Sequence, residues 1–458
     1  MSAAAAARLL GARIEGDPAV VLTGAEVDSR RVGPGDLFVA LPGERVDGHR
    51  FVAEALAAGA AALVREGAGV APPPPGRALI EVGDTLAAYH ALAAAERRRR
   101  PWRVVAVTGS VGKTTVKAML ATLGGARYRT GASEGNRNST LGLPAEILSQ
   151  PEEVELFVAE MGMSHPGELG ELAAIVAPDL LLYTRIAPAH MAFFPDLAAV
   201  AEAKAEALAH VAPGGTVVLN ADDPWQAGFA GRAGNARIVR YGGAEEADVR
   251  LVAVVERGLE GSRMTVEAAG ERVAFDLPLA GRHQAANCLA ALAAAWSLGV
   301  PLADAAAAAE TLEPAPHRGR VLRLPEGVTV VDDSYNASPE AVRVMLDLLA
   351  ATAGRRVAVL GEMLELGALA EPAHREAGTR AAAAADVLLA VGGAPAEEMA
   401  RAARRAGLAR VEHLSDAAAA LERLRGLLEP GDVVLVKGSR GIGLDAVVAG
   451  LAGGEGDG

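Results

Sequence analysis

Short apolar segments that do not alternate with polar residues recur through the middle and last thirds of this 458-residue chain. Such a pattern is typical of strands that are buried on both faces, because every side chain then meets a covering layer. Helix-like stretches separate these segments, which favours parallel sheets covered by helices. The segments lie at residues 104–107, 156–161, 180–184 and 216–219, and again at 328–332, 356–360, 387–391 and 433–436. The sequence therefore predicts an α/β protein with parallel sheets.

Two seams divide the chain into three predicted domains. The first is the charge run at 96–100, which Pro101 closes ahead of an apolar strand, and we expect it to be the solvated end of a helix. The second is the segment 313–316, where two prolines follow an alanine-rich helix. The predicted domains cover residues 1–98, 99–313 and 314–458. We expect a small α/β domain, then a central parallel-sheet domain, then a Rossmann-like, doubly wound domain.

The bulk composition excludes several classes of protein. The net charge of −13 argues against nucleic acid or an anionic membrane as a partner, because both call for a basic surface. A single cysteine, Cys288, excludes a disulfide framework and fits a reducing compartment. No apolar run approaches the roughly 20 residues that span a bilayer, and the first residues have no signal-peptide pattern. We expect a cytoplasmic protein without membrane insertion, and we expect a monomer.

A phosphate-binding loop is the most specific motif of the chain. Residues 104–120, VVAVTGSVGKTTVKAML, have the pattern of a buried strand, a glycine-containing loop and the start of an apolar helix. In such loops backbone N–H groups and a lysine bind phosphates, and the hydroxyl after the lysine binds Mg²⁺. A purely structural glycine turn is the alternative, but the flanking strand and helix favour ATP binding. The predicted ATP-binding residues here are Thr108, Gly109, Ser110, Val111, Gly112, Lys113, Thr114 and Thr115.

Lysine is rare in this chain, which makes each copy informative. Only Lys113, Lys117, Lys204 and Lys437 occur, while all other basic residues among the 44 lysines and arginines are arginine. An ammonium is a compact charge whose nitrogen can be modified, so the retained lysines are candidates for sites where arginine fails. We expect Lys117 to be a solvated neighbour of the loop. Lys204 lies in an amphipathic helical run, where an ordinary surface lysine is the alternative.

Two more residues end predicted strands beside the phosphate loop. Glu160 ends the strand FVAE, and His190 follows the strand-like run YTRIAPA. The carboxyl ends of parallel strands are where ligands bind, and a carboxylate and an imidazole there can hold cations that bridge triphosphate oxygens. A lone Glu or His is more often structural, but the phosphate loop in the same sheet favours a metal role for both.

Together these motifs resemble the Mur ligase family of peptidoglycan synthesis. The similar segments are TGSVGKTT, EGNRNSTLGLP, EMGMSHPGE, IAPAH with AEAKAE downstream, LNADDP and GRHQAANCLAA, in family order. The later segments DDSYNASP, VLGEMLELG and VLVKGSRG are similar to members that add D-alanyl-D-alanine to UDP-N-acetylmuramoyl-tripeptide. The resemblance covers nearly the whole chain. It implies an ADP-forming peptide ligase that uses ATP and two Mg²⁺ ions, with that UDP-linked tripeptide and the dipeptide as its partners.

The resemblance also implies a catalytic set, formed by Lys113, Glu160, His190 and Lys204. Thr114 and Glu160 would bind one Mg²⁺, and His190 and Lys204 would bind the second. Lys204 would do so as N6-carboxylysine, a carbamate anion that only a neutral primary amine can form with CO₂. Arginine cannot make this modification.

Substrate contacts follow from the same resemblance, segment by segment. His283 and Asn287 would contact adenine, while Arg320 and Asp333 would close on the γ-phosphate and the ribose. The residues implied for the UDP-linked substrate are Ser29, Arg30, Asp47, Gly48, His49 and Asn138. Those implied for the incoming dipeptide are Tyr335, Asn336, Lys437 and Arg440.

The most consequential departure from the family pattern and two alternatives remain open at this point. Arg185 stands where the family usually has Asn, and a cation there would compete with the metals unless it points outward. A sibling ligase, of the folylpolyglutamate or tripeptide-forming type, is the nearest alternative. The other is a nucleotide-switch protein that binds partners without ligation. The motifs leave the third residue of the peptide, diaminopimelate or lysine, undecided.

Overall fold

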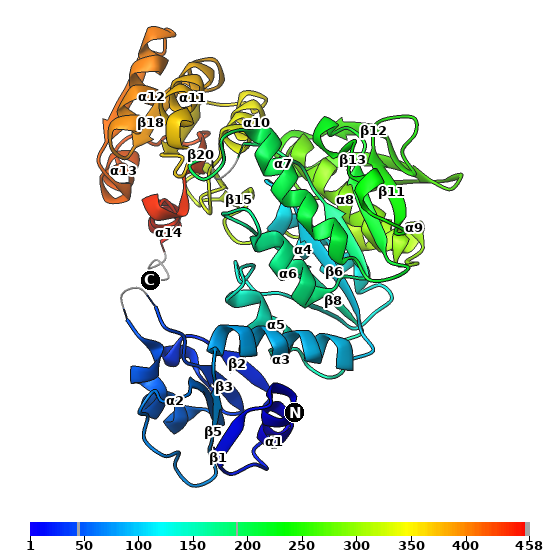
Figure 1. Cartoon of the computed structure of the whole chain (residues 1–458). Helices are drawn as coiled ribbons and strands as arrows, with labels where there is room; N and C mark the ends of the chain where they lie inside the picture. The colour runs from blue at the N-terminus through cyan, green and yellow to red at the C-terminus, as the bar shows by residue number, and fades with distance from the viewer. Residues whose placement is uncertain (44–45, 189–190, 454–458) are drawn as a thin grey trace.

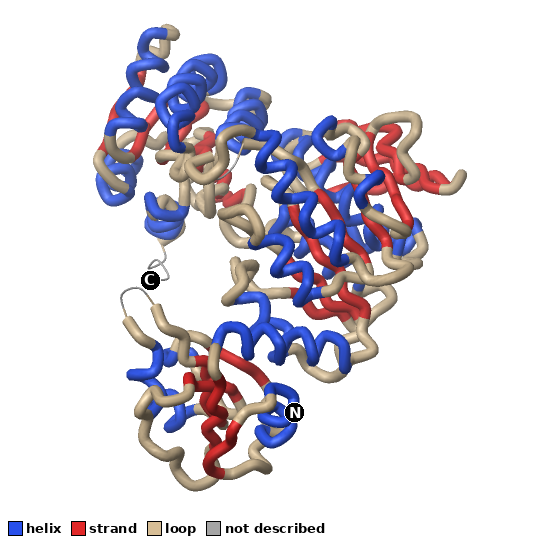
Figure 2. The backbone as a smooth tube through the Cα atoms, viewed as in Figure 1, coloured by secondary structure: helices blue, strands red, loops and turns tan. Residues whose placement is uncertain are grey.

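The computed structural model describes residues 1–43, 46–188 and 191–453, and these residues form three separate β-sheets. Figure 1 shows the N-terminal part (blue) and the C-terminal part (orange to red) on different sides of the central part (cyan to yellow-green). In the same view, Figure 2 shows strands flanked by helices in each part. The predicted three-part α/β architecture is confirmed.

The N-terminal sheet has five strands in the order β1-β5-β4-β3-β2. Strands β2 to β5 run parallel, and β1 pairs antiparallel with β5. Helices α1 and α3 share one apolar cluster with the sheet, and α2 packs on its other face. The bounds are α1 Ala3–Leu10, β1 Arg13–Gly16, β2 Gly24–Glu26, β3 Asp36–Val39, α2 Val52–Ala58, β4 Ala61–Arg65, β5 Ala78–Val82 and α3 Thr85–Arg99.

The C-terminal end of α3 corrects the interpretation of the charge run. Glu96, Arg97 and Arg100 are all less than a tenth exposed, whereas Arg98 and Arg99 are exposed, so this helix end is solvated on one side only. Arg97 donates to the carbonyl oxygen of Val176 at 2.8 Å and forms an ion pair with Asp179 at 2.8 Å. The central domain covers this helix end, and its carbonyl and carboxylate oxygens satisfy the buried guanidinium groups. The predicted boundary after residue 98 falls inside the last turn of α3.

The central sheet has nine strands in the order β14-β13-β12-β11-β10-β9-β6-β8-β7. Strands β6 to β12 run parallel, as expected from the sequence, and β13 and β14 extend the sheet antiparallel. The sheet is therefore mixed. The bounds are β6 Arg103–Thr108, β7 Thr130–Ala132, β8 Leu156–Glu160, β9 Leu180–Tyr183, β10 Thr216–Asn220, β11 Arg237–Gly242, β12 Val249–Glu256, β13 Ser262–Ala268 and β14 Glu271–Leu277.

Helices cover both faces of the parallel part of the central sheet. Residues of α4, α8 and α9 share an apolar cluster with one face, and residues of α5, α6 and α7 share a cluster with the other. This two-sided burial explains why the strands are apolar at consecutive positions. The bounds are α4 Lys113–Gly124, α5 Gly142–Ser149, α6 Glu168–Val176, α7 Leu197–Ala205, α8 Arg282–Ser297 and α9 Leu302–Ala309.

The C-terminal sheet has six strands in the order β15-β16-β20-β17-β18-β19, parallel except for the edge strand β15. Helices α10, α11 and α12 pack on one face, and α13 and α14 pack on the other, which is the doubly wound arrangement expected. Among the described residues, no helix is both long and apolar enough to cross a membrane. The bounds are β15 Arg320–Arg323, β16 Thr329–Asp332, α10 Pro339–Ala350, β17 Arg356–Gly361, α11 Ala370–Ala384, β18 Val387–Val391, α12 Ala394–Arg405, β19 Arg410–Leu414, α13 Ala417–Arg425, β20 Val433–Lys437 and α14 Asp445–Leu451.

Candidate active site

The phosphate loop joins β6 to α4, as the motif predicts. Gly109 and Gly112 have φ angles of +141° and +83°, which glycine adopts without strain. A Cβ atom at Gly109 would lie 2.0 Å from Thr184 Oγ1, and one at Gly112 would lie 2.6 Å from Asn287 Oδ1. The Thr184 hydroxyl also donates to the carbonyl oxygen of Val111 at 2.7 Å. The end of β9 and the start of α8 therefore hold the loop from two sides.

Lys113 lies over this loop at the first turn of α4. Its Nζ donates to the carbonyl oxygens of Gly109 at 3.0 Å and Ser110 at 3.3 Å. The pKa of Lys113 is lowered, mainly by burial. The charge of Glu160 opposes this shift, and the charge of Arg318 adds to it. The ammonium is thus held beside the N–H groups of a helix N-terminus, where phosphates bind.

An arginine of the C-terminal domain reaches this loop, and it was not among the predicted site residues. One Nη of Arg318 donates to Thr114 Oγ1 at 3.2 Å, and the guanidinium lies 4.2 Å from the centre of the Tyr335 ring. Arg320, the predicted γ-phosphate residue, is exposed on the edge strand β15. His317, just before Arg318, has a φ of +59°, so the backbone turns sharply here. The sequence showed two arginines two residues apart and gave no signal to choose between them.

Glu160 ends β8 and is 2% exposed. Its Oε1 accepts a hydrogen bond from Asn138 Nδ2 at 2.7 Å, and its backbone N–H donates to Ser133 Oγ at 3.0 Å. Its Oε2 is buried and has no hydrogen-bond partner. A buried carboxylate oxygen without a partner costs free energy, and a cation offsets that cost. Asn138, which the resemblance implied for the UDP-linked substrate, holds this carboxylate, and its contact with the substrate stays a prediction.

The prediction that Lys117 is a solvated neighbour of the loop is wrong. Lys117 is 5% exposed, and its Nζ donates to the carbonyl oxygens of Ser133 and, at 3.3 Å, Gly135. The Nζ also lies 3.8 Å from Glu160 Oε2. The position one turn after Lys113 points beneath the loop toward β8, and the neighbouring segment 133–138 covers it. The sequence of α4 alone does not show that segment 133–138 buries Lys117.

Lys204 lies in the last turn of α7 and is 3% exposed, so it is not a surface lysine. Burial lowers its pKa well below the ordinary lysine range, and the nearby charge of Lys113 lowers it further. Within the described part of the chain, no carboxylate forms an ion pair with it. The Tyr183 hydroxyl donates to the carbonyl oxygen of Lys204 at 2.8 Å, which fixes this turn against β9. Burial and the charge of Lys113 therefore both disfavour the protonated form of the Lys204 amine.

Two residues of the segment after β9 have different outcomes. His190 lies outside the described residues, so its predicted metal role stays a prediction. Arg185 forms an ion pair with Glu340 of α10 at 3.2 Å, and its side chain is 59% exposed. Arg185 therefore points toward the C-terminal domain, in the outward direction that removes the expected conflict with a metal.

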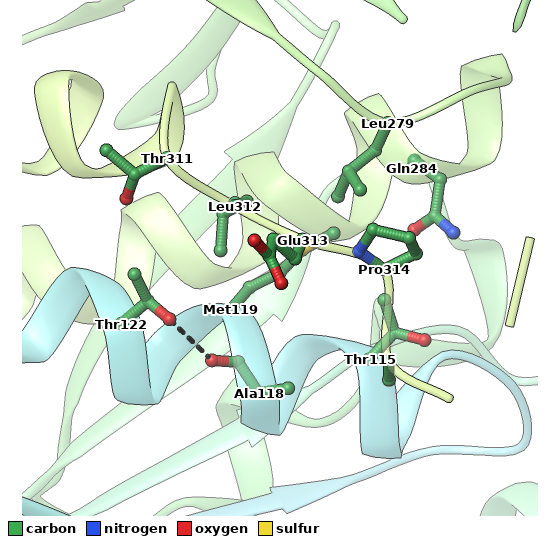
Figure 3. Close-up of a pocket in the computed structure, with 11 residues that line it drawn as sticks. Thr115, Ala118, Met119, Thr122, Leu279, Gln284, Thr311, Leu312, Glu313 and Pro314 are labelled. Atoms are coloured by element: carbon green, nitrogen blue, oxygen red, sulfur yellow. Dashed lines mark hydrogen bonds between the residues drawn. The ribbon is translucent and has the colours of Figure 1, made fainter. Parts of the chain in front are cut away.

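A cavity of about 270 Å³ lies next to the phosphate loop, between α4, the start of α8 and the linker after α9. Figure 3 shows Met119, Leu279 and Leu312 as its apolar side and Gln284 beside Pro314 at one edge. This cavity is smaller than pockets that hold a whole drug-sized ligand, so it suits a single base. The two implied adenine residues, His283 and Asn287, do not line this cavity, and Asn287 lies against the loop at Gly112.

His283 lies close to charged groups of the C-terminal domain, and its adenine contact stays a prediction. The pKa of the His283 ring is lowered, mainly by burial. The charge of Asp333 opposes this shift, and the charge of Lys437 adds to it. Lys437 is 2% exposed, and its Nζ forms a 2.5 Å ion pair with Asp333 and donates to the carbonyl oxygen of Asn336 at 2.9 Å. The ammonium of Lys437 is thus engaged within its own domain, where it fixes Asp333 and the loop that follows β16.

The other residues implied for the dipeptide surround one aromatic ring. Two guanidinium groups lie near the Tyr335 ring, Arg318 at 4.2 Å and Arg440 at 5.5 Å from the ring centre. The Arg440 group is also 3.5 Å from the Tyr335 hydroxyl. The side chain of Asn336 accepts from the backbone N–H of Ala337 at 2.8 Å. Arg318, which contacts both the Tyr335 ring and Thr114, therefore links Tyr335 and Arg440 to the phosphate loop.

Apart from Asn138, the residues implied for the UDP-linked substrate lie in two turns of the N-terminal domain. Ser29 and Arg30 belong to a short 3₁₀ turn, where Arg30 is exposed and paired with Asp28 at 2.6 Å. His49 is buried, and both of its ring nitrogens are engaged: Nδ1 with Asp47 Oδ1 at 2.6 Å, and Nε2 with the N–H of Arg65 at 2.9 Å. Gly48 packs closely on the backbone of Leu41. His49 therefore holds this turn together from inside.

Comparison with known proteins matches each part of the chain to the same family. Residues 21–97 match the catalytic domain of the Mur ligase family, residues 107–295 match the Mur ligase middle domain, and residues 317–440 match the Mur ligase glutamate ligase domain. These three matches follow the order of the three sheets.

Curated relatives and solved structures cover nearly the whole chain. It is 34% identical to the UDP-N-acetylmuramoyl-tripeptide–D-alanyl-D-alanine ligase of Bacillus subtilis, over 94% of this chain and 93% of that protein. It is 35% identical to the Escherichia coli ligase of the same name, over 94% of both. A crystal structure of MurF from Acinetobacter baumannii superposes with a TM-score of 0.88 and 30% identity, covering 99% of this chain and 98% of that one. MurF from Thermotoga maritima in complex with ADP superposes with a TM-score of 0.79 and 30% identity, covering 94% and 97%.

A more distant solved structure shares the fold at low sequence identity. A folylpolyglutamate synthase of Mycobacterium tuberculosis shares 20% identity with a TM-score of 0.60 and covers 80% of this chain, which establishes the common fold alone. The full-length relatives and the three successive domain matches, by contrast, agree with the phosphate loop and the buried lysines around it. The chain belongs to the Mur ligase family.

Proposed function

We infer that this chain is an ATP-dependent, ADP-forming ligase that joins D-alanyl-D-alanine to UDP-N-acetylmuramoyl-tripeptide in peptidoglycan synthesis. The observation that carries this function is the identity of about 35% over the full length of curated ligases with that reaction. The domain limits 1–98, 99–313 and 314–458 fit the assignment, because each resulting part contains one sheet. We also propose that the protein works in the cytoplasm as a monomer.

ATP binding is supported by the phosphate loop and by the relative solved with ADP. We place the triphosphate on the loop and Lys113, and the adenine in the cavity beside Thr115 and Gln284. Arg318 is better placed than Arg320 to meet the γ-phosphate, because it already contacts Thr114 across the domain boundary. Asp333, held by Lys437, remains our candidate for the ribose.

The residues present fit a divalent cation at Glu160. Its buried Oε2 lacks a hydrogen-bond partner, and Thr114 lies on the phosphate loop of the same sheet. Within the described residues, no three His, Cys, Asp or Glu side chains converge. Mg²⁺ in such sites takes one or two protein ligands and completes its shell with phosphate oxygens and water. We propose Thr114 and Glu160 for one Mg²⁺, and His190 with carboxylated Lys204 for a second, where the ions would neutralise charge on the transferring phosphoryl group.

The proposed chemistry begins at the tripeptide carboxylate, which is a poor acyl donor because oxide is a poor leaving group. Its oxygen attacks the γ-phosphorus of ATP, the bond to the β-phosphate oxygen breaks, and an acyl phosphate and ADP form. The neutral dipeptide amine then attacks the acyl carbon, loses a proton, and expels phosphate, leaving an amide. Lys113 and Arg318 would stabilise the charge on the phosphoryl oxygens, and three parts of the chain would position three substrates.

The polar turns outside the ATP site complete the proposal. Ser29, Arg30 and the turn at Asp47 and Gly48 would receive the UDP-linked substrate, with His49 holding that turn. Tyr335, Asn336 and Arg440 would face the dipeptide, with Lys437 acting through Asp333 and the Asn336 carbonyl.

Mass spectrometry of the product tests this function. Incubation with ATP, Mg²⁺, UDP-N-acetylmuramoyl-tripeptide and D-alanyl-D-alanine is expected to give the UDP-linked pentapeptide, with both diaminopimelate and lysine forms of the tripeptide offered. Product with glutamate in place of the dipeptide would favour a sibling ligase. ATP turnover without any amide product would favour a nucleotide switch.

A further inference from the structure

Lys117 is a buried lysine for which the reaction described above has no use. Its side chain crosses beneath the phosphate loop from α4 to the segment 133–138, which connects β7 with the region before α5. There it donates to the carbonyl oxygens of Ser133 and Gly135. A buried ammonium is costly unless such partners satisfy it, so its retention calls for a local reason.

The segment that Lys117 holds is the one that fixes Glu160 at two points. Ser133 Oγ accepts from the backbone N–H of Glu160 at 3.0 Å, and Asn138 Nδ2 donates to its Oε1 at 2.7 Å. These contacts leave only Oε2 available, and that atom is buried without a hydrogen bond. The segment 133–138 therefore determines which carboxylate oxygen is free and where it lies.

Lys117 supports this arrangement without blocking it. Its Nζ is 3.8 Å from Glu160 Oε2, which is beyond hydrogen-bond distance but close enough to compensate the carboxylate charge. Two of the three N–H donors of the ammonium go to the two carbonyl groups. A guanidinium is longer and planar, so an arginine at this position would have to displace the segment or approach the carboxylate. This requirement accounts for the lysine at position 117 in a chain whose basic residues are nearly all arginine.

The same segment is also tied to the N-terminal domain. Arg137 forms ion pairs with Glu26 of β2 and, at 3.4 Å, with Glu146 of α5. Arg137 anchors the outer side of the segment, whereas Lys117 anchors its inner side, next to Glu160. Loss of Arg137 would be expected to disturb the domain contact, and loss of Lys117 to disturb the carboxylate.

We propose that Lys117 is a positioning residue for the metal site: it fixes segment 133–138 so that Ser133 and Asn138 present the free oxygen of Glu160 to Mg²⁺. The proposal rests on the metal role assigned to Glu160. Partners that orient a metal ligand typically change metal affinity by about 10- to 100-fold when they are removed. We therefore expect the Lys117→Met variant to bind Mn²⁺, in the presence of a non-hydrolysable ATP analogue, at least about tenfold more weakly than the native protein.

The experiment measures Mn²⁺ binding by electron paramagnetic resonance and, separately, hydrogen exchange of the amides 133–138 in the metal-free protein. Lys117→Arg keeps the charge but changes the reach, so positioning predicts weaker Mn²⁺ binding and faster exchange for it as well as for Lys117→Met. Native Mn²⁺ affinity in a folded Lys117→Arg variant would overturn the proposal, because charge alone would then suffice. Glu160→Gln separates the two assignments: if it leaves Mn²⁺ affinity unchanged, the metal role of Glu160 fails, whatever Lys117 does.

Discussion

Arg318 and Arg320 offer a matched pair of variants, because both are arginines in one short segment and only one reaches the phosphate loop. Arg318 donates to Thr114 Oγ1 at 3.2 Å and packs on the Tyr335 ring, whereas Arg320 is exposed on β15. We expect Arg318→Ala to remove a charged donor aimed at the transferring phosphoryl group. Loss of one preorganised donor of this kind costs about 10²- to 10³-fold in kcat, or about 3–4 kcal/mol.

Arg320→Ala should behave as a surface substitution, within about 0.5 kcal/mol of the native protein in stability and within about twofold in kcat. Phosphate release is measured at saturating ATP, UDP-linked tripeptide and dipeptide, with circular dichroism as the control for folding. Equal losses in the two variants, or a larger loss for Arg320→Ala, would refute the assignment of Arg318 to the phosphate.

Three further outcomes follow from buried ionisable groups. Lys113→Ala should lower kcat by several orders of magnitude without changing the circular dichroism spectrum, and near-native turnover would remove Lys113 from the catalytic set. Lys204→Arg keeps the charge but cannot react with CO₂, so it should be as damaging as Lys204→Ala, and acetate should partly restore only the alanine variant; a fully active arginine variant would exclude the carbamate. His374 accepts from the N–H of Met363 at 2.9 Å, and burial lowers its pKa while the Ala370 carbonyl and Glu362 raise it. Because the folded pKa is below the unfolded value of about 6.5, stability from the neutral ring is fully present above that pH and is lost as the pH falls toward the folded pKa. The native Tm should therefore drop more than that of His374→Gln between pH 6.5 and 5, and parallel curves would contradict this role.

Segments with strong local signals were predictable from the sequence. The phosphate loop needs glycine at two positions with positive φ, followed by a lysine and a hydroxyl. The structure has this loop between β6 and α4. The parallel strands were predictable because burial on both faces leaves consecutive apolar residues. The antiparallel pair β13 and β14 was not predictable, because Ala-Gly is a weak turn signal. Its hairpin turns at Ala269 and Gly270, with φ angles of +49° and +82°.

Burial by distant segments could not be predicted. Lys117, Arg97 and Arg100 look like solvated charges in their local sequence, and only the packing of other segments covers them. Lys204 is the opposite case, because the scarcity of lysine suggested a special role before its burial was known. The contact of Arg318 with Thr114 depends on how two domains meet, which no local pattern encodes.

The central claim is that the ligase activates a carboxylate by phosphorylating it, and an isotope experiment tests this most directly. UDP-N-acetylmuramoyl-tripeptide labelled with ¹⁸O in its terminal carboxylate is incubated with ATP, Mg²⁺ and D-alanyl-D-alanine, and the released phosphate is analysed by mass spectrometry. The acyl phosphate route predicts that one ¹⁸O atom moves from the carboxylate to phosphate for each amide formed. Unlabelled phosphate released in step with amide formation would contradict the account.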